Sequence, residues 1–497
     1  MSPSDLKRKS NLGLAYSMLS RFSIFAISLG STILMARLLT PREFGIIAMA
    51  AVFSGLASIL QEAGLTAATI QAQTLTKEQR SGAFWLNSCI GAFLSLLLAL
   101  SAPFITSFYD EPQLISVIHV LAIEFLLVSL GMQHLAVLRR EMRFLSVSVI
   151  EFVANVAGVT AGLIWALRDP TVWALVAIQL TRTATRTILS WCVGTWLPGS
   201  PKTIPSTKPL LKFAINLTIF NILNYISSNI DKILIGKDWG SFQLGLYNRA
   251  QHLLQLPLSN FNGPISSVFV PVLSRLQDNA AEYRTYYLRG IRIVSFIGKP
   301  VIVVLVVLAE PLITLVLGQK WVGASPIFQA LGVGAFLGVT NIASGWVYSS
   351  LGRTDRQLKF ELFSMPIRIA GIWLGSAYGA LGVAIAISST RALLYLPLRI
   401  YAFRYTPISI MDFLRAIHRE SIASILAGGV VQLLLMNAAF LADASNVFSI
   451  FVGMSVFFLS YLLIYSCLPG GWAGLKSLLA EIYGLRKSQR KAASADE

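Results

Sequence analysis

The sequence predicts an all-α polytopic membrane protein with two six-helix lobes around a central cavity and two further C-terminal helices, about fourteen transmembrane helices in all. Two observations carry this fold class. The 497 residues are 55% hydrophobic and only 13% charged, whereas soluble domains carry about 25% charge. A sequence motif near the start of the chain also returns, more loosely, about two hundred residues later.

The candidate spans are stretches of about 20 mostly apolar residues, the length that crosses a bilayer. Basic connections separate many of them, and no connection is long enough to form a soluble domain. The expected limits are 11–39, 44–62, 83–105, 113–135, 147–167, 171–196, 211–235, 244–273, 291–317, 326–350, 358–377, 380–401, 413–436 and 447–468.

The repeated motif divides the chain into halves. In the first copy an apolar run ends near Arg37, a polar turn follows, and Gly45 opens the next run. In the second copy the polar turn is 237–240, and Gly245 and Ala250 correspond to Gly45 and Ala50. The predicted organisation is an N-terminal lobe (1–200), a C-terminal lobe (201–405), two additional transmembrane helices (406–470) and a cytoplasmic amphipathic tail (471–497).

The orientation follows from the positive charges, which gather on cytoplasmic connections. One alternating set of connections is rich in lysine and arginine, whereas the opposite set holds only Arg42, Arg168, Lys237 and Lys320. This contrast predicts that both termini are cytoplasmic and that the number of spans is even.

Several other functions are disfavoured. The net charge of +17 comes from residues spread between apolar runs rather than from one basic face, so we expect no nucleic-acid partner. There is no P-loop motif for ATP, and the three cysteines and four histidines match no metal-site spacing. We therefore expect no metal and no bound cofactor.

Arginines within the apolar runs are the candidate binding residues. A charge in the hydrocarbon region is costly and usually faces a cavity or a partner, and arginine suits phosphate because its planar fork forms bidentate bonds. The alternative is that each arginine pairs with a carboxylate or extends toward the interface. The candidates for a cationic cavity that holds a pyrophosphate are Arg21, Arg182, Arg186, Arg249, Arg368 and Arg391.

Three prolines in one apolar run form a candidate hinge. Pro257, Pro264 and Pro271 recur every seven residues, which places them on nearly one side of a helix. Proline removes a backbone hydrogen bond and kinks a helix. The run is therefore either a bending element or a statically curved helix.

Seven short motifs resemble the Wzx-type polysaccharide flippases of the multidrug/oligosaccharidyl-lipid/polysaccharide exporter superfamily, in particular the colanic acid exporter type. The similarity extends from about residue 11 to about residue 405 and is moderately specific for the subfamily. The motifs are ARLLTPREFG (36–45), QEAGL (61–65), FWLN (84–87), NILNY (221–225), LGLYNRA (244–250), PVLSRLQ (271–277) and GQKW (318–321).

The resemblance implies a transporter rather than an enzyme. Its substrate would be an oligosaccharide repeat unit on undecaprenyl pyrophosphate, moved from the cytoplasmic to the periplasmic leaflet of the bacterial inner membrane. Alternating access would be coupled to an H⁺ or Na⁺ gradient, for which Asp231, Glu124 and Glu151 are the candidate residues. Expected partners are the lipid-linked oligosaccharide, membrane lipids, a polysaccharide polymerase and a chain-length regulator. The alternatives are a drug or metabolite exporter of the same superfamily and a membrane polysaccharide polymerase or ligase.

Overall fold

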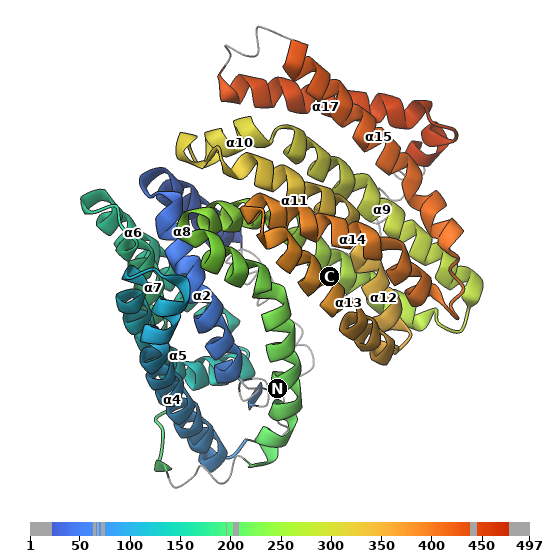
Figure 1. The fold of residues 1–497 in the computed structure, drawn as a ribbon. Helices are drawn as coiled ribbons and strands as arrows, with labels where there is room; N and C mark the ends of the chain where they lie inside the picture. The colour runs from blue at the N-terminus through green and yellow to red at the C-terminus, as the bar shows by residue number, and fades with distance from the viewer. Residues whose placement is uncertain are drawn as a thin grey trace. The chain divides into compact units, whose positions relative to one another are not determined.

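The computed structural model describes residues 22–62, 66, 69–70, 75–194, 196–201, 208–437 and 445–476, and these residues form helices and short connections without a β-strand (Figure 1). The prediction of an all-α membrane protein is confirmed. Within the described residues, nine helices are long and apolar enough to cross a membrane, and two shorter apolar helices cover Phe22–Leu38 and Ile265–Arg275. The total of about fourteen stays a prediction.

The chain divides into two compact units, Met1–Asn248 and Arg249–Glu497. In the first unit, α6 packs along α7, and α5 packs on both α4 and α7. The division falls inside a long helix, α8, and the lobe limits expected from the sequence remain predictions. The helices of the first unit are α2 (Pro41–Glu62), α4 (Lys77–Tyr109), α5 (Gln113–Arg140), α6 (Phe144–Arg168), α7 (Trp173–Val193) and the first part of α8 (Lys208–Arg275).

In the second unit, α13 packs on α14, α14 packs on α11, and α15 packs on both α9 and α17. A single 3₁₀ turn, η2 (Gln319–Trp321), precedes α11. The helices are the rest of α8, α9 (Ala280–Val307), α10 (Ala309–Val316), α11 (Ala324–Gly338), α12 (Asn341–Ser350), α13 (Thr354–Ser376), α14 (Gly379–Phe403), α15 (Ile410–Asn437) and α17 (Asn446–Cys467).

Two expected spans are interrupted. The stretch predicted as 291–317 is divided at Leu308 between α9 and α10. Pro311 explains the position, because its nitrogen cannot donate to the carbonyl of the preceding turn. The stretch predicted as 326–350 is divided at Val339 and Thr340 between α11 and α12, although Ala324–Ser350 still counts as one span.

The break in α8 lies at Gly240. Its backbone has φ 75° and ψ −177°, a conformation that glycine adopts readily and other residues rarely do. Gly240 is the last residue of the polar turn that the sequence places between the expected spans 211–235 and 244–273. The two expected spans therefore both lie within α8, but the backbone at Gly240 divides α8 into two helical segments.

The two copies of the repeated motif meet at a helix crossing within the first unit. A Cβ atom added to Gly45 of α2 would lie 1.7 Å from the carbonyl oxygen of Ser241, and one added to Gly245 would lie 1.8 Å from the carbonyl oxygen of Pro41. The contact is reciprocal: each glycine faces the carbonyl of the residue that lies one helical turn before the other glycine. Glu111 bridges the two helices at this crossing. It forms an ion pair of 2.9 Å with Arg42 of α2 and accepts a 2.7 Å hydrogen bond from the Ser241 hydroxyl of α8.

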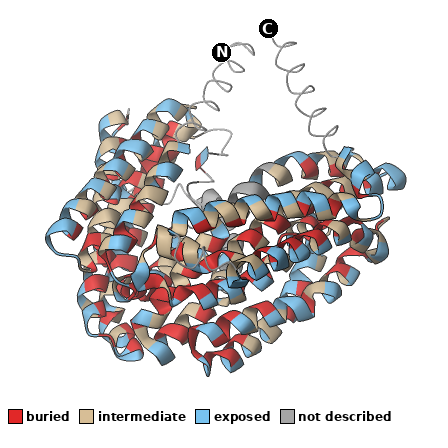
Figure 2. Ribbon diagram, turned by 90° about the horizontal axis from the view of Figure 1, so that it is seen from above, coloured by how far each residue is buried: buried red, intermediate tan, exposed pale blue. Residues whose placement is uncertain are grey.

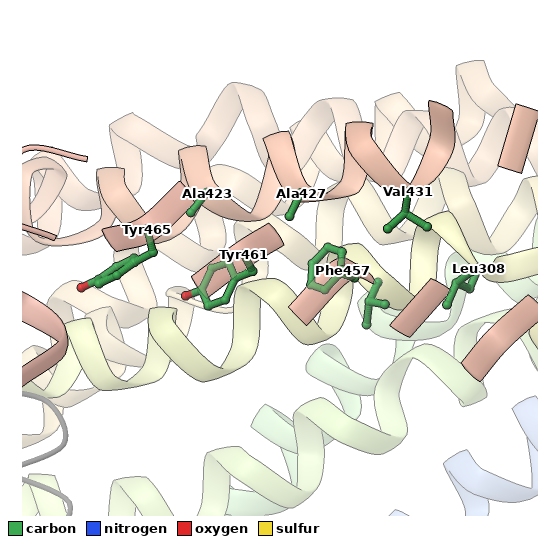
Figure 3. Packing of buried hydrophobic residues seen from close by; sticks show 8 residues of the cluster. Leu308, Ala423, Ala427, Val431, Phe457, Tyr461 and Tyr465 are labelled. Atoms are coloured by element: carbon green, nitrogen blue, oxygen red, sulfur yellow. The ribbon is translucent and has the colours of Figure 1, made fainter. Parts of the chain in front are cut away.

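Apolar packing is carried by narrow stripes along the helices. Figure 2 shows buried and exposed residues alternating around most of them, as expected where one side meets protein and the other meets lipid. In the second unit, Ala423, Ala427 and Val431 of α15 form such a stripe against Phe457 and other residues of α17 (Figure 3). The small alanines allow the two helices to approach closely.

Candidate functional site

A polar face on α7 is the candidate functional site of the first unit. Gln179, Arg182, Thr183 and Arg186 recur at intervals of three and four residues, so they lie on one side of the helix. α7 packs against α5 and α6, and both of those helices bring a glutamate to this face. The result is a polar network between three helices that are otherwise apolar.

Glu124 of α5 is held by two neutral donors from α7. Its carboxylate accepts hydrogen bonds from the Gln179 amide nitrogen at 2.5 Å and from the Thr183 hydroxyl at 3.0 Å. Arg182 lies close enough for a favourable electrostatic interaction with the same carboxylate. Glu124 therefore lies near the positive charge of Arg182, while its two carboxylate oxygens accept hydrogen bonds from the neutral side chains of Gln179 and Thr183.

Glu151 of α6 is held by arginines. Its Oε1 atom lies 3.0 Å from an Nη atom of Arg186 on α7 and 3.8 Å from an Nη atom of Arg139 on α5. The Glu151 side chain is 26% exposed and that of Arg186 is 34% exposed. One carboxylate thus serves two guanidinium groups, and the cluster retains a net positive charge.

A close helix approach positions Arg182. A Cβ atom added to Gly158 of α6 would lie 2.6 Å from the carbonyl oxygen of Ile178 and 2.9 Å from the Cβ atom of Arg182. Only glycine leaves room for α7 here. The same spacing continues at Gly162, whose added Cβ would meet the Ile178 side chain at 2.1 Å. The close packing of α6 and α7 at these two glycines therefore fixes where Arg182 lies.

Hydroxyl and indole groups extend the α5–α7 contact. Thr187 donates to the carbonyl of Leu127 at 2.7 Å, and Trp191 donates to the carbonyl of Leu130 at 2.8 Å. Sequence reasoning missed Gln179, Thr183 and Thr187, because it considered only ionisable groups. Their helical spacing from Arg182 and Arg186 was the available signal.

Asp231, the third carboxylate candidate, belongs to a separate environment on α8. It is 4% exposed, and it accepts a 2.5 Å hydrogen bond from the Tyr247 hydroxyl. The backbone nitrogen of Lys232 also donates to it at 2.9 Å. The Tyr247 bond spans the break at Gly240, so Asp231 links the two segments of α8; its role in ion coupling stays a prediction.

The arginine candidates of the second unit lie on different helices. Arg368 of α13 pairs with Glu361 of the same helix at 2.7 Å. Arg391 of α14 is exposed and lies beside Gly334 of α11, where an added Cβ would be 3.3 Å from its Cδ atom. Arg249 lies on α8 and is partly exposed. A cavity shared by Arg182, Arg186, Arg368 and Arg391 remains a prediction, as does a substrate role for Arg249.

The remaining candidates are Arg21 and the three prolines. Arg21 lies outside the described residues. Pro257, Pro264 and Pro271 all lie within α8, whose only non-helical backbone geometry is at Gly240. Their role as a hinge stays a prediction. Among the residues that the structure describes, no three His, Cys, Asp or Glu side chains gather in a way that could hold a metal ion.

Two solved structures are similar in fold. The lipid II flippase MurJ, in an inward closed conformation, matches with a TM-score of 0.70 at 15% identity, over 91% of this chain and 98% of that chain. An inward-facing multidrug resistance MATE family transporter matches with a TM-score of 0.60 at 15% identity, over 76% and 94%. The chain therefore shares the fold of these two membrane proteins.

The family follows from the sequence comparison. Residues 34–326 match the family described as polysaccharide biosynthesis protein, and the chain belongs to that family. It is an integral membrane transport protein and not an enzyme, as the sequence predicted.

Relatives from two bacteria are similar over most of the chain. Lipopolysaccharide biosynthesis protein WzxC of Escherichia coli is 26% identical over 384 residues, which cover 77% of this chain and 78% of the relative. Teichuronic acid biosynthesis protein TuaB of Bacillus subtilis is 28% identical over 367 residues, which cover 73% and 76%. The resemblance to polysaccharide exporters stated from the motifs is confirmed.

Proposed function

We propose that this protein moves an oligosaccharide repeat unit linked to undecaprenyl pyrophosphate across the bacterial inner membrane, from the cytoplasmic to the periplasmic leaflet. The observation that carries the proposal is family membership over more than half of the chain. The repeat unit then serves the synthesis of an exopolysaccharide or a lipopolysaccharide. Both termini face the cytoplasm in this account, as the charges of the connections predict.

The polar network of the first unit supports an anionic substrate. Arg139, Arg182 and Arg186 face Glu124 and Glu151, which leaves one positive charge in excess. Guanidinium groups bind phosphate oxygens through two parallel hydrogen bonds. A pyrophosphate that approaches this face can replace Glu151 as the partner of Arg186, or it can bind Arg186 while the Arg186–Glu151 ion pair stays in place.

The energy for transport comes, in this account, from an H⁺ or Na⁺ gradient rather than from a bound cofactor. Membrane carboxylates can take up and release a cation as the protein alternates between its inward and outward states. Glu124, Glu151 and Asp231 are the candidates from the sequence. Glu124 suits this task because its partners from α7, Gln179 and Thr183, are neutral, so protonation breaks no ion pair.

A drug exporter of the same superfamily is the second candidate, favoured by the fold similarity to a MATE transporter. The names of the sequence relatives, which refer to lipopolysaccharide and teichuronic acid biosynthesis, support the polysaccharide substrate instead. The excess of arginine in the polar network is also more suitable for an anion than for a cationic drug.

Deletion of the gene tests the proposal. We expect surface polymer to be lost and lipid-linked repeat units to accumulate on the cytoplasmic face of the membrane. The position of the accumulated sugar is measured with a lectin or glycosidase added to inverted and to right-side-out vesicles. Accumulation on the periplasmic face would instead indicate a defect in polymerisation, and normal polymer would remove the protein from the pathway.

A further inference from the structure

A second set of buried ionisable groups lies in the second unit, where α9, α15 and α17 meet. Glu420 of α15 is 1% exposed. Its Oε1 atom accepts a hydrogen bond of 3.5 Å from the Tyr465 hydroxyl of α17, which is at the limit of a hydrogen bond. Its Oε2 atom is buried and has no hydrogen-bond partner among the described residues. A fully solvated carboxylate would have several.

A lysine is buried beside this glutamate. Lys299 of α9 is 2% exposed. Its ammonium group donates to the Ser421 hydroxyl and to the Ile417 carbonyl, the latter at 3.4 Å. Both acceptors lie on α15 next to Glu420. The ring of Phe336 lies 5.2 Å from the ammonium nitrogen, so apolar and aromatic groups complete the surroundings of the lysine.

In the predicted topology, the site lies within the membrane rather than at its surface. An exposed ion pair joins Arg284 of α9 to Asp412 of α15 at 2.6 Å, near the cytoplasmic ends of both helices in the predicted topology. Glu420 is eight residues further along α15, roughly 12 Å at the helical rise per residue. The α15–α17 stripe of Ala423, Tyr461 and Tyr465 continues from it (Figure 3).

Burial and the surrounding charges act on Glu420 in opposite directions: burial disfavours the carboxylate anion, whereas the nearby cations favour it. The charged and titratable groups that interact with Glu420 are Lys299 and Arg292 of α9, Arg419 of α15, and Tyr461 and Tyr465 of α17; Arg399 of α14 faces Lys299. A buried carboxylate without full hydrogen bonding is costly. Protonation removes that cost, whereas ionisation regains the attraction of the lysine.

A metal cation is a poorer occupant than a proton. Na⁺ prefers several oxygen ligands, and the ammonium group of Lys299 already occupies the Ser421 and Ile417 oxygens on this side of α15. Ser424 is also engaged, because its hydroxyl donates to the Glu420 carbonyl at 2.6 Å. The unpartnered Oε2 atom can accept a proton without any of these groups moving.

We propose that Glu420, with Lys299, is a proton-binding site of the second unit, in which the Glu420 carboxylate takes up one proton and later releases it. No bond other than the O–H bond forms or breaks. The site rests on the proposed function, since it would supply the coupling proton for transport. It differs from Glu124, Glu151 and Asp231, which are all in the first unit.

Infrared difference spectroscopy of the purified protein in lipid nanodiscs tests the site without any substrate. Lowering the pH should produce the C=O band of a protonated buried carboxyl group, and Glu420→Gln should remove that band. Glu310→Gln, which changes an exposed glutamate of the same unit, should retain it. An unchanged band in Glu420→Gln would overturn the proposal, as would a band that depends on Na⁺ rather than on pH.

Export in cells separates this proposal from the proposed function. Glu420→Gln should reduce polymer at least tenfold with a normal amount of protein in the membrane, whereas Glu420→Asp, which keeps the acid, should retain part of the export. If Glu420→Gln does not fold, the infrared band should shift in Glu420→Asp, and an unshifted band would refute the proton-binding site.

Normal polymer in the deletion strain would refute the proposed function but not the proton-binding site, because the infrared measurement does not depend on transport.

Discussion

Arg186 and Glu151 form an ion pair between α7 and α6, with 3.0 Å between an Nη atom and Oε1. The sequence predicted these residues for different tasks, Arg186 for substrate binding and Glu151 for ion coupling. In the structure each is the other's partner, and Arg139 approaches the same carboxylate at 3.8 Å. A substrate phosphate must therefore compete with Glu151 for Arg186.

Exchange of this pair distinguishes a structural role from a binding role. Arg186→Ala should destabilise the protein by about 1–3 kcal/mol, because it leaves Glu151 with only the more distant Arg139. Arg186→Glu combined with Glu151→Arg should restore the amount of protein in the membrane, as measured by immunoblot. If the arginine binds substrate, export should stay low in the exchanged protein.

The control for this exchange is the Arg368–Glu361 pair, which is confined to α13 and has side-chain exposures of 37% and 50%. Exchange of its members should leave the amount of protein unchanged, because exposed ion pairs stabilise a protein by only about 0.2–1 kcal/mol. Full export by the exchanged Arg186–Glu151 protein would show that the pair is structural.

The crossing of α2 and α8 should tolerate no side chain at either glycine. In Gly45→Ala the new methyl group would meet the backbone of Ser241 at 1.7 Å, so a helix must move. We expect a loss of at least about 1–3 kcal/mol, the usual cost of overpacking, seen as a lower apparent Tm in detergent. Gly429→Ala is the matched control, since nothing lies within 4 Å of its added Cβ.

The fold could be predicted from the sequence because each span needs only length and apolar composition. Gly45 and Gly245 were recognised as equivalent, but a repeat shows which positions correspond and not that they touch. The Arg186–Glu151 pair was not predictable, because the two residues lie on different helices and no sequence spacing indicates which residues of two helices are in contact. Glu420 was not predicted for another reason. It lies ten residues into α15 and is close in sequence to Asp412, Arg415 and Arg419. In the sequence alone it therefore resembles one of several charged residues at the membrane interface.

Arg21 lies outside the described residues. It is near the start of the first expected span, 11–39, and we expect it to make the first contact with a pyrophosphate that enters from the cytoplasmic leaflet. Arg21→Lys keeps the charge but loses the planar fork, so export should fall only in part. Arg21→Ala should reduce substrate affinity about ten- to a hundredfold, the value of a charge-assisted bond of roughly 1.5–3 kcal/mol. The protein level should not change, and full export by Arg21→Ala would remove the residue from the mechanism.

The predicted topology places Ser200 in the cytoplasm and Lys237 in the periplasm. Paired alkaline phosphatase and fluorescent protein fusions at these two positions should give fluorescence at Ser200 and phosphatase activity at Lys237. The expectation rests on the excess of basic residues in one alternating set of connections. The reverse pattern would invert the whole orientation, including the assignment of the Arg284–Asp412 pair to the cytoplasmic ends of α9 and α15.

The central claim is that the protein itself moves a lipid-linked oligosaccharide between leaflets. The direct measurement uses purified protein in vesicles that contain undecaprenyl pyrophosphate bearing a fluorescent oligosaccharide, with an impermeant quencher added outside. We predict that nearly all of the fluorescence becomes quenchable when the protein is present and a proton gradient is applied, compared with about half in empty vesicles, where only the outer leaflet is accessible. An identical quenched fraction with and without the protein, at an amount that gives several copies per vesicle, would contradict the account.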